Sequence, residues 1–496
     1  MNNKKLIIIG SGFSGLSAAC CMARQGWHVT VLEKHATPGG RARQLKDAGF
    51  TFDMGPSWYW MPEVFENFFS CFNKKISDYY TLKRLDPSYR IYFEDDAIDV
   101  PADYEELKML FEKIEPGSSN ALDKFLKEAE YKYKVGMEKL VFRPGNSFSE
   151  FADADLIKGV FRLDVFTSVK KHISKYFSNR KLQQMLEFPV LFLGALPEKI
   201  PALYSLMNYA DIKGGTWFPE GGMYSLVDAM YQLAIDLGVN FSFNTNVKSV
   251  IIKNNMASGV EAEINQSKEF IEADAVISSA DYHHTENNLL PDAFRNYSEN
   301  WWDKKQMAPG CILYYVGISK KLKNVLHHSL FFDTSFEQHG KEIYDTKQWP
   351  SNPLFYVSAT SVTDESLAPP GCENLFFLIP AAAGLTGDTE ELREKYFTMI
   401  AERFEQRTGE KIRDHIIYKK SYAHKDFVYD YNAYKGNAYG LANTLMQTAN
   451  FKPALRNKKA GNVFYTGQLT VPGPGVPPAI ISGQVVANEV IKSWGK

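Results

Sequence analysis

Cysteines are few and scattered in this sequence. Its 496 residues include five, and only Cys20 and Cys21 are adjacent. An odd number without regular spacing does not fit a disulfide framework and indicates a reducing compartment. We expect Cys20 and Cys21 to pack within a helix.

Long hydrophobic runs are also missing. Leu375–Leu385 contains a proline and is about half the length of a membrane-spanning helix, which needs about 20 residues. Lys4 and Lys5 precede an apolar segment too short for a signal peptide. The sequence therefore predicts a cytoplasmic protein with no transmembrane span.

No charge of one sign dominates. The net charge is −2, and we find no zinc-finger or other nucleic-acid motif, so we expect no nucleic-acid partner. Hydrophobic residues at 45% and charged residues at 23% are ordinary for a globular chain of two or three domains. Aromatic residues at 14% indicate an aromatic-rich core or a large apolar binding surface.

What the sequence does have is a strand–turn–helix–strand unit over Leu6–Lys34. A short β-branched run precedes Gly-x-Gly-x-x-Gly at Gly10, Gly12 and Gly15, and a small-residue helix follows. Gly10 permits the tight turn, Gly12 permits close approach of a pyrophosphate, and Gly15 permits close helix–strand packing. The helix N-terminus offers free N–H groups to phosphate. Glu33 ends the second strand, where its carboxylate can accept hydrogen bonds from ribose hydroxyls.

Two further motifs follow in order. The glycines of Gly39-Gly40-Arg41 let the backbone approach a ligand, and the arginine can pair with phosphate. Gly55-Pro56-Ser57 suggests a rigid turn with a hydroxyl donor. Residues 10–58 thus resemble the N-terminal signature of the FAD-dependent amine oxidase and carotenoid desaturase superfamily, which implies FAD instead of NAD.

The resemblance extends to the C-terminus. Gly467 and the loop before the helix at Val476 and Pro477 match the element under the flavin ring, and Val247 matches the residue whose backbone holds the adenine. The expected cofactor contacts are Gly10, Gly12, Phe13, Ser14, Gly15, Glu33, Lys34, Gly39, Gly40, Arg41, Gly55, Pro56, Ser57, Val247, Gly467, Val476 and Pro477. No metal ligand is among them.

The order of elements predicts a discontinuous Rossmann-like α/β domain for FAD, formed by residues 1–70, 213–290 and 455–496. Alternating strands at 71–100 and aromatic strands within 291–454 predict an α+β substrate domain. Residues 101–212 are mostly helical in pattern. We expect them to form a lid or membrane-facing subdomain.

Leu156–Lys181 carries an amphipathic pattern. Phe166, Val169, Ile173 and Phe177 recur at helical spacing, with lysines and arginine beside them. A core-facing helix with solvated lysines explains this pattern, and so does a peripheral contact with the inner face of the membrane. A membrane-dissolved substrate favours the second interpretation.

Five motifs sharpen the resemblance to bacterial phytoene desaturases: Gly39–Ala42, Asp53–Pro62, Gly214–Met223, Gly436–Leu441 and Gly467–Gly483. One departure is Lys452 before Pro453, where the family pattern usually has arginine. The resemblance implies desaturation of an acyclic long-chain carotenoid, most simply phytoene to lycopene, by hydride transfer to FAD and proton loss. Reduced flavin then passes electrons to oxygen or a quinone.

No His/Asp dyad stands at convincing spacing. Trp217 and Tyr439 lie in two glycine-dense loops that we expect beside the flavin, where they either pack as wall residues or stabilise a cation. The alternatives are a later hydroxycarotenoid 3,4-desaturase, a carotene isomerase, an amine oxidase, or a flavin-free module that binds prenylated proteins, of the GDP-dissociation-inhibitor type.

Overall fold

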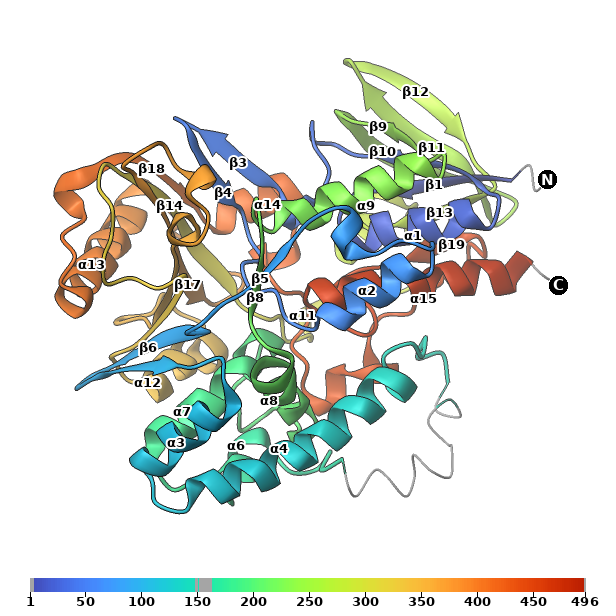
Figure 1. The fold of residues 1–496 in the computed structure, drawn as a ribbon. Coiled ribbons are helices and arrows are strands. Elements are labelled where there is room, and N and C mark those ends of the chain that lie inside the picture. Colours follow the sequence, from blue (N-terminus) through green and yellow to red (C-terminus); the bar gives the residue numbers. More distant parts are fainter. Residues whose placement is uncertain (1–3, 148–149, 151–162, 495–496) are drawn as a thin grey trace.

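The computed structural model describes residues 4–147, 150 and 163–494. In Figure 1 a parallel sheet with its helices lies at the right, a large mixed sheet lies at the left, and a group of helices lies below them. Both ends of the described chain lie on the side of the parallel sheet.

The parallel sheet has five strands drawn from distant parts of the chain. In sheet order they are β19 (Val463–Tyr465), β13 (Ala275–Ser278), β1 (Lys5–Ile9), β2 (His28–Leu32) and β9 (Asn240–Ser242). Leu6 pairs with Val29 on one side and with Ala275 on the other. The apolar run Leu6–Ile9 is buried, as a central parallel strand requires.

Helices α1 (Phe13–Arg24), α9 (Tyr224–Asp236) and α15 (Val476–Trp494) pack on this sheet, with α1 between the other two. A Cβ on Gly483 of α15 would lie 2.4 Å from the Ser14 carbonyl oxygen of α1. The two ends of the described chain therefore fold against each other.

An antiparallel meander follows α9. It contains β10 (Thr245–Lys253), β11 (Met256–Ile264) and β12 (Ser267–Glu272). A register shift between Val247 and Ser249 interrupts the pairing of β10 with β11.

The second large sheet has seven strands. In sheet order they are β18 (Ile416–Tyr422), β14 (Gly310–Ile318), β17 (Glu373–Ala381), β16 (Phe355–Ser358), β15 (His328–Phe332), β6 (Tyr89–Phe93) and β7 (Ala97–Val100). Side chains alternate between its faces. Phe331 and Phe377 pack with Phe404 of α13 (Glu390–Thr408), whereas Leu330 and Tyr356 face the other way, into a different hydrophobic cluster.

Two small ribbons join these units. They are β3 (Gln44–Asp47) with β4 (Phe50–Asp53), and β5 (Leu82–Arg84) with β8 (Trp217–Pro219). Helix α2 (Pro62–Ser70) follows the first ribbon. The strands predicted within 71–100 are therefore divided, because β5 pairs with β8 while β6 and β7 join the large sheet.

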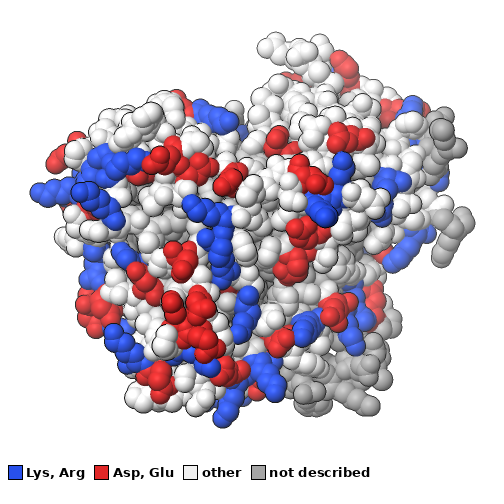
Figure 2. Space-filling view, viewed as in Figure 1, with Lys and Arg blue, Asp and Glu red and all other residues white. Residues whose placement is uncertain are grey.

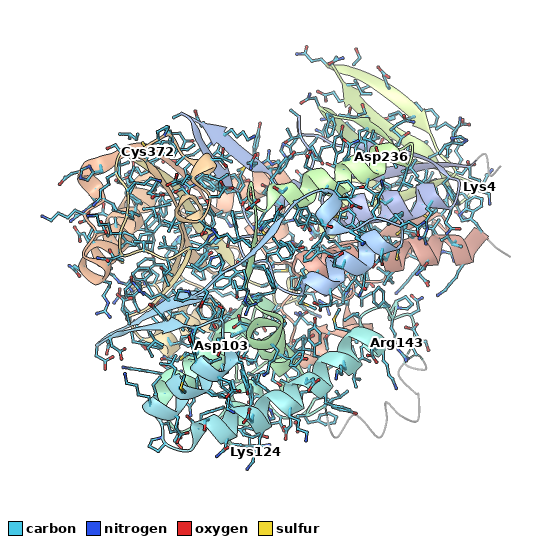
Figure 3. The ribbon with its side chains drawn as sticks, in the orientation of Figure 1. Lys4, Asp103, Lys124, Arg143, Asp236 and Cys372 are labelled. Carbon is cyan, nitrogen blue, oxygen red and sulfur yellow. The ribbon has the colours of Figure 1, made fainter. Side chains whose placement is uncertain are left out.

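The helical region holds α3 (Tyr104–Ile114), α4 (Ser118–Val135), α6 (Val169–Ile173), α7 (Arg180–Glu187) and α8 (Leu206–Tyr209). Asp103, labelled in Figure 3, caps α3 by accepting hydrogen bonds from the N–H groups of Glu105 and Glu106. None of the helices in the described ranges combines the length and apolarity needed to cross a membrane.

The amphipathic stretch is only partly as predicted, and its residues 156–162 lie outside the described chain. Val169, Ile173 and Phe177 are buried, which confirms a core-facing apolar side, but Phe166 is 79% exposed. Lys170 pairs with Glu198, and Lys181 pairs with Asp95 and Asp96. Acidic side chains therefore already neutralise part of the basic face.

Candidate functional site

One large cavity, of about 740 Å³, extends from the parallel sheet into the helical region. Its polar end lies at the carboxyl ends of the parallel strands, where β1 leads to Gly10, β2 to Glu33, β13 to Ser279 and β19 to Thr466. The carboxyl edge of a parallel sheet is where α/β proteins bind ligands, because the turns into the helices converge there.

The glycine turn opens toward this cavity. Gly10 has φ +93°. A Cβ on Gly12 would meet nothing closer than Ser279 Oγ at 4.0 Å, so the turn leaves space for a ligand. Helix α1 has no side-chain cap at Gly12, and Gly12, Phe13 and Ser14 line the cavity. These are the conditions for holding a phosphate at a helix N-terminus.

Gly15 has a different position. It does not line the cavity, and a Cβ there would lie 2.2 Å from the Gly10 carbonyl oxygen. This geometry agrees with its expected role in helix–strand packing and does not place it as a cofactor contact.

Glu33 is nearly buried at the end of β2. Its Oε2 accepts hydrogen bonds from the N–H and Oγ of Ser11, at 2.9 and 2.7 Å, and its Oε1 accepts from His35 N–H at 2.9 Å. A carboxylate has about four acceptor positions, so it retains capacity for a ribose hydroxyl. Lys34 lines the same end and donates from Nζ to the Tyr429 carbonyl.

The Gly39–Arg41 segment packs directly on the glycine turn. Gly39 donates its N–H to the Ser11 carbonyl at 2.9 Å, and a Cβ on Gly40 would lie 3.3 Å from Gly12 Cα. The Arg41 guanidinium is buried in the cavity wall, with a bond of 3.3 Å to the Asn437 carbonyl. Burial lowers the pKa of Arg41, and the charge of Asp281 opposes this effect.

Gly55, Pro56 and Ser57 also line the cavity. A Cβ on Gly55 would lie 2.5 Å from the Arg41 carbonyl oxygen, so the two motifs require glycine where they cross. Behind them, the half-buried Asp53 carboxylate accepts hydrogen bonds from the N–H groups of Met223 and Tyr224, at 2.7 and 3.1 Å. Burial raises its pKa to about 6.

The remaining predicted contacts come from distant segments. Val247 lines the cavity from β10. Gly467 follows β19 and donates its N–H to Ser482 Oγ at 3.0 Å, while Val476 and Pro477 begin α15. All three line the cavity as well.

The two aromatic candidates, Trp217 and Tyr439, differ in position. Tyr439 is part of the wall, and burial raises its pKa. Trp217 is not among the described residues of the wall. It pairs with Arg84 across the β5–β8 ribbon, and its Nε1 donates to the Gly214 carbonyl at 2.9 Å. Its predicted place beside the flavin is therefore not where the structure puts it, because the ribbon holds the indole away from the cavity.

Sequence reasoning missed several wall residues. Ser279 and Asp281 follow β13, and their position after a buried strand was a usable signal. Burial raises the pKa of Asp281. Trp58 directly follows the Gly55-Pro56-Ser57 motif, so its position was also a usable signal. Tyr356 had no such signal, because a strand pattern does not say which sheet face borders a cavity.

The other half of the cavity is apolar. The seven-stranded sheet and the helical region supply most of its side chains: Met137, Leu140, Val141, Leu163, Val165, Phe188, Leu191, Leu193, Leu203, Met207, Leu313, Leu330, Phe332, Phe336, Ile343, Leu354 and Leu378. Arg143, labelled in Figure 3, lies beyond the end of α4 and also lines it. A wall of this kind suits a ligand with a long hydrocarbon part.

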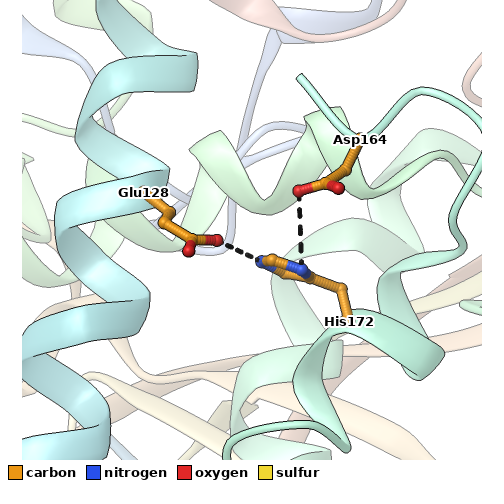
Figure 4. Close-up of side chains that lie close together, drawn as sticks. All are labelled: Glu128, Asp164 and His172. Carbon is orange, nitrogen blue, oxygen red and sulfur yellow. Dashed lines mark ion pairs between the residues drawn. The ribbon is translucent and has the colours of Figure 1, made fainter. Parts of the chain in front are cut away.

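One acidic–histidine cluster lies in the helical region. Figure 4 shows Glu128, Asp164 and His172 converging, and no other such group of possible metal ligands occurs within residues 4–147, 150 and 163–494. The buried Lys132 Nζ lies 3.1 Å from Asp164 Oδ2 and 3.3 Å from His172 Nε2. Burial and this neighbouring cation lower the pKa of His172 to about 4. The Lys132 ammonium thus already provides the positive charge that a metal ion would bring to this cluster.

The polar end fits a dinucleotide. The start of α1 has no side-chain cap, and Gly12 leaves space beside it. Glu33 adds a buried carboxylate, and Arg41 adds a buried guanidinium whose Nε has no partner among the described residues. Fold and site together define a dinucleotide-binding protein whose site continues into an apolar cavity.

The family model for flavin containing amine oxidoreductases matches residues 13–491, and the chain belongs to this family. It is an FAD-dependent oxidoreductase. A "Carotenoid 3,4-desaturase" from Haloarcula japonica is 39% identical, with 99% of each chain covered. A "zeta-carotene-forming phytoene desaturase" from Myxococcus xanthus is 30% identical, with 99% of this chain and 94% of that protein covered.

Solved structures share the fold at low identity. An oxidoreductase from Methanosarcina mazei superposes with a TM-score of 0.62 at 15% identity, covering 98% of this chain and 100% of that one. Cyclohexylamine oxidase from Brevibacterium oxydans gives 0.61 at 15% identity, with full coverage of both. The predicted mixed α/β architecture is therefore confirmed as that of flavoprotein oxidoreductases. The alternative of a flavin-free prenyl-protein-binding module is not supported.

Proposed function

We propose that this protein desaturates an acyclic carotenoid. The observation that carries the proposal is the continuity of one cavity from the dinucleotide end into a wall of leucine, methionine and phenylalanine side chains. Two relatives of nearly full coverage are named as carotenoid desaturases. A polyene placed along the apolar half would point toward the polar end.

The residue assignments follow the two halves. Gly12, Phe13 and Ser14 would receive the pyrophosphate, Glu33 the ribose and Val247 the adenine. Arg41, Ser57, Gly467, Val476 and Pro477 would surround the rest of the cofactor, with Tyr439 in the wall near it. FAD supplies the acceptor for a hydride from an allylic carbon. The protein orients the polyene and excludes water from it.

The domain division is part of the proposal. Residues 1–70, 213–290 and 455–496 would bind FAD, 71–100 and 291–454 would bind substrate, and 101–212 would cover the apolar half. The pairing of β5 with β8 means that the first two units share a ribbon.

Two substrates deserve separate tests. Phytoene is the simplest one for an acyclic desaturase. The 3,4-bond of a more unsaturated acyclic carotenoid is the second, and the greater identity to the Haloarcula japonica protein favours it. A carotene isomerase would leave the flavin without net reduction, so it would need no electron acceptor. For the desaturase we propose oxygen or a quinone as acceptor.

Expression in cells that accumulate phytoene, and separately in cells that accumulate lycopene, tests both substrates. We expect a more unsaturated pigment in at least one strain. Unchanged pigment in both strains, from a protein that carries FAD, would contradict carotenoid desaturation.

We also propose peripheral attachment to the inner face of the membrane. Exposed apolar side chains adjoin residues that line the cavity: Phe142 precedes Arg143, Phe166 follows Val165, and Met446, 64% exposed, precedes Thr448 by two residues. An apolar rim around a cavity is suited to contact with a lipid surface.

Flotation with phospholipid vesicles tests this attachment. Met446→Glu should reduce the bound fraction several-fold. Met109→Glu is the matched control, because Met109 is 65% exposed on α3 and does not line the cavity. Equal flotation of the two variants would contradict contact between the apolar rim at Met446 and the lipid surface.

A further inference from the structure

Desaturation releases a proton as well as a hydride, and the sequence offered no acceptor for it. The structure contains a buried hydroxyl–imidazole pair on the cavity wall. Tyr356 Oη lies 2.6 Å from His328 Nδ1. Tyr356 lines the cavity, whereas His328 lies behind it and is fully buried.

The pair is held on three sides. Tyr356 and His328 come from neighbouring antiparallel strands, β16 and β15, and face the cavity side of the sheet. The indole of Trp58 stacks on the imidazole, with ring centroids 4.0 Å apart and planes inclined by 15°. Burial raises the pKa of the Tyr356 phenol, and the hydroxyls of Ser57 and Ser358 oppose this effect.

His328 is uncharged at neutral pH, because burial holds its pKa well below the usual range and the neighbouring His327 lowers it further. Its Nε2 has no hydrogen-bond partner among the described residues. Leaving a buried polar nitrogen unpaired costs about 1–3 kcal/mol.

Resting on the function proposed above, we propose that Tyr356 and His328 accept the proton that the substrate releases during desaturation. Tyr356 is the catalytic residue, because it borders the substrate cavity. His328 acts through it, as a positioning and proton-storing residue.

One C–H bond of the substrate would break with its electron pair leaving as a hydride, for which bound FAD would be the acceptor, and the carbon chain would thereby lose two electrons. The C–H bond on the next carbon then breaks, and its pair becomes the second bond of the new C=C. The proton bonds to Tyr356 Oη as the phenol's own proton passes to His328 Nδ1. The imidazolium returns the proton through Tyr356 once the product has left.

A weak, uncharged base suits this step. A C–H bond beside a polyene cation is strongly acidic, so little basicity is needed to remove its proton. A carboxylate anion at that place would bond to the cation. The nearby Asp53 carboxylate is instead engaged by two backbone N–H groups, at 2.7 and 3.1 Å. The Trp58 face stabilises the transient imidazolium by a cation–π interaction.

The test is an anaerobic single turnover with phytoene or lycopene, whichever the parent protein converts. Tyr356→Phe keeps the ring on the wall and removes the hydroxyl. We expect product formation to slow by about a hundredfold, the scale of general base catalysis, with unchanged FAD content. His328→Gln should slow it to a similar extent.

An isotope measurement separates a proton acceptor from a packing residue. With deuterium on the carbon that loses the proton, the parent should slow little, since its proton transfer is fast. The Tyr356→Phe variant should slow several-fold further, because proton loss then limits the rate. A structural defect would not change which bond limits the reaction.

Tyr314→Phe is the matched control. Tyr314 is also buried in the seven-stranded sheet and donates a bond of 2.6 Å, to the Arg393 carbonyl, on the face away from the cavity. It should keep the parent's rate and isotope pattern. If Tyr356→Phe and His328→Gln behave like Tyr314→Phe, the proton relay is overturned while carotenoid desaturation stands. A parent protein that converts neither carotenoid overturns the proposed function, and the relay with it.

Discussion

The two halves of the cavity are built in different ways. The polar half uses backbone: turns at the carboxyl ends of parallel strands, an uncapped helix start, and glycines packed where no side chain fits. The apolar half uses side-chain faces, contributed by alternate residues of the seven-stranded sheet and by the helical region. Backbone geometry restricts residue identity strongly, whereas an apolar wall accepts many residues of similar volume.

This difference predicts unequal sensitivity to substitution. A change in the polar half should remove the cofactor without unfolding the protein, if the added atoms enter the cavity. A change in the apolar half should alter substrate affinity and leave the cofactor bound.

Gly12→Val should weaken FAD binding. Its side chain would enter the cavity at the helix start, where a Cβ has no protein neighbour closer than 4.0 Å. We expect affinity for FAD to fall by at least about tenfold, equivalent to 1.4 kcal/mol, with the melting temperature of the apoprotein unchanged. Flavin absorbance per protein measures the effect.

Gly214→Ala is the control for that substitution. A Cβ at Gly214 also meets nothing within 4 Å, but the residue does not line the cavity. Its flavin content should equal the parent's. Full flavin occupancy in Gly12→Val would show that the polar half tolerates side chains after all.

Met207→Gln should weaken carotenoid binding alone. Met207 is half-buried in the apolar wall, and an amide facing hydrocarbon costs about 1–3 kcal/mol. The KM for the carotenoid should rise by about tenfold with flavin content unchanged, as measured in vesicles. Met109→Gln, on an exposed methionine outside the cavity, should leave KM as it is. Loss of FAD from Met207→Gln would contradict the independence of the two halves.

His327→Gln should reduce the loss of folding stability at acid pH. His327 is buried outside the cavity wall. Burial lowers the pKa of His327 to about 3, so its imidazole stays neutral in the folded state while it becomes protonated in the unfolded state below about pH 6.5. The unfolded state binds more protons, and stability therefore falls as the pH falls.

Between pH 6.5 and 5, protonation of His327 in the unfolded state should by itself lower the free energy of unfolding by about 2 kcal/mol. The variant should lose correspondingly less stability over that interval, as followed by thermal unfolding at several pH values. The pKa of Asp53 is raised to about 6 in the folded state, so its protonation increases stability as the pH falls. The effect of His327 is therefore read from the difference between parent and variant. Parallel curves for the two proteins would be the contrary result.

Lys170→Gln should have the smallest effect. Its ion pair with Glu198 lies at the surface of the helical region, and exposed pairs contribute less than about 1 kcal/mol. We expect an unchanged melting temperature and unchanged flotation with vesicles. A large loss of vesicle binding would show that the basic face, and not the apolar rim at Met446, contacts the lipid.

Charge is distributed without a dominant patch on the face shown in Figure 2, where basic and acidic side chains are interspersed. In the helical region, Lys170 pairs with Glu198 and Lys181 pairs with Asp95. Periodicity alone placed these lysines beside an apolar stripe but did not show their acidic partners, which come from distant segments.

The sequence by itself determined the parallel-sheet unit and its turn. Leu6–Ile9, the glycines at 10, 12 and 15, and Glu33 form β1, the α1 start and the end of β2 as predicted, because local backbone geometry dictates these residue types. The motifs at Gly39–Arg41 and Gly55–Ser57 likewise reach the cavity, since each needs glycine where two backbones cross.

Only the tertiary structure decided which side chains face the cavity. It removed Trp217 from the wall, because pairing with β5 turns that residue away, and it brought Tyr356 to the wall with His328 behind it. Strand periodicity predicts which residues share a face of a strand, but it does not predict whether that face packs against a helix or borders a cavity. That choice depends on how sheets and helices from distant segments pack, which no local pattern in the chain contains.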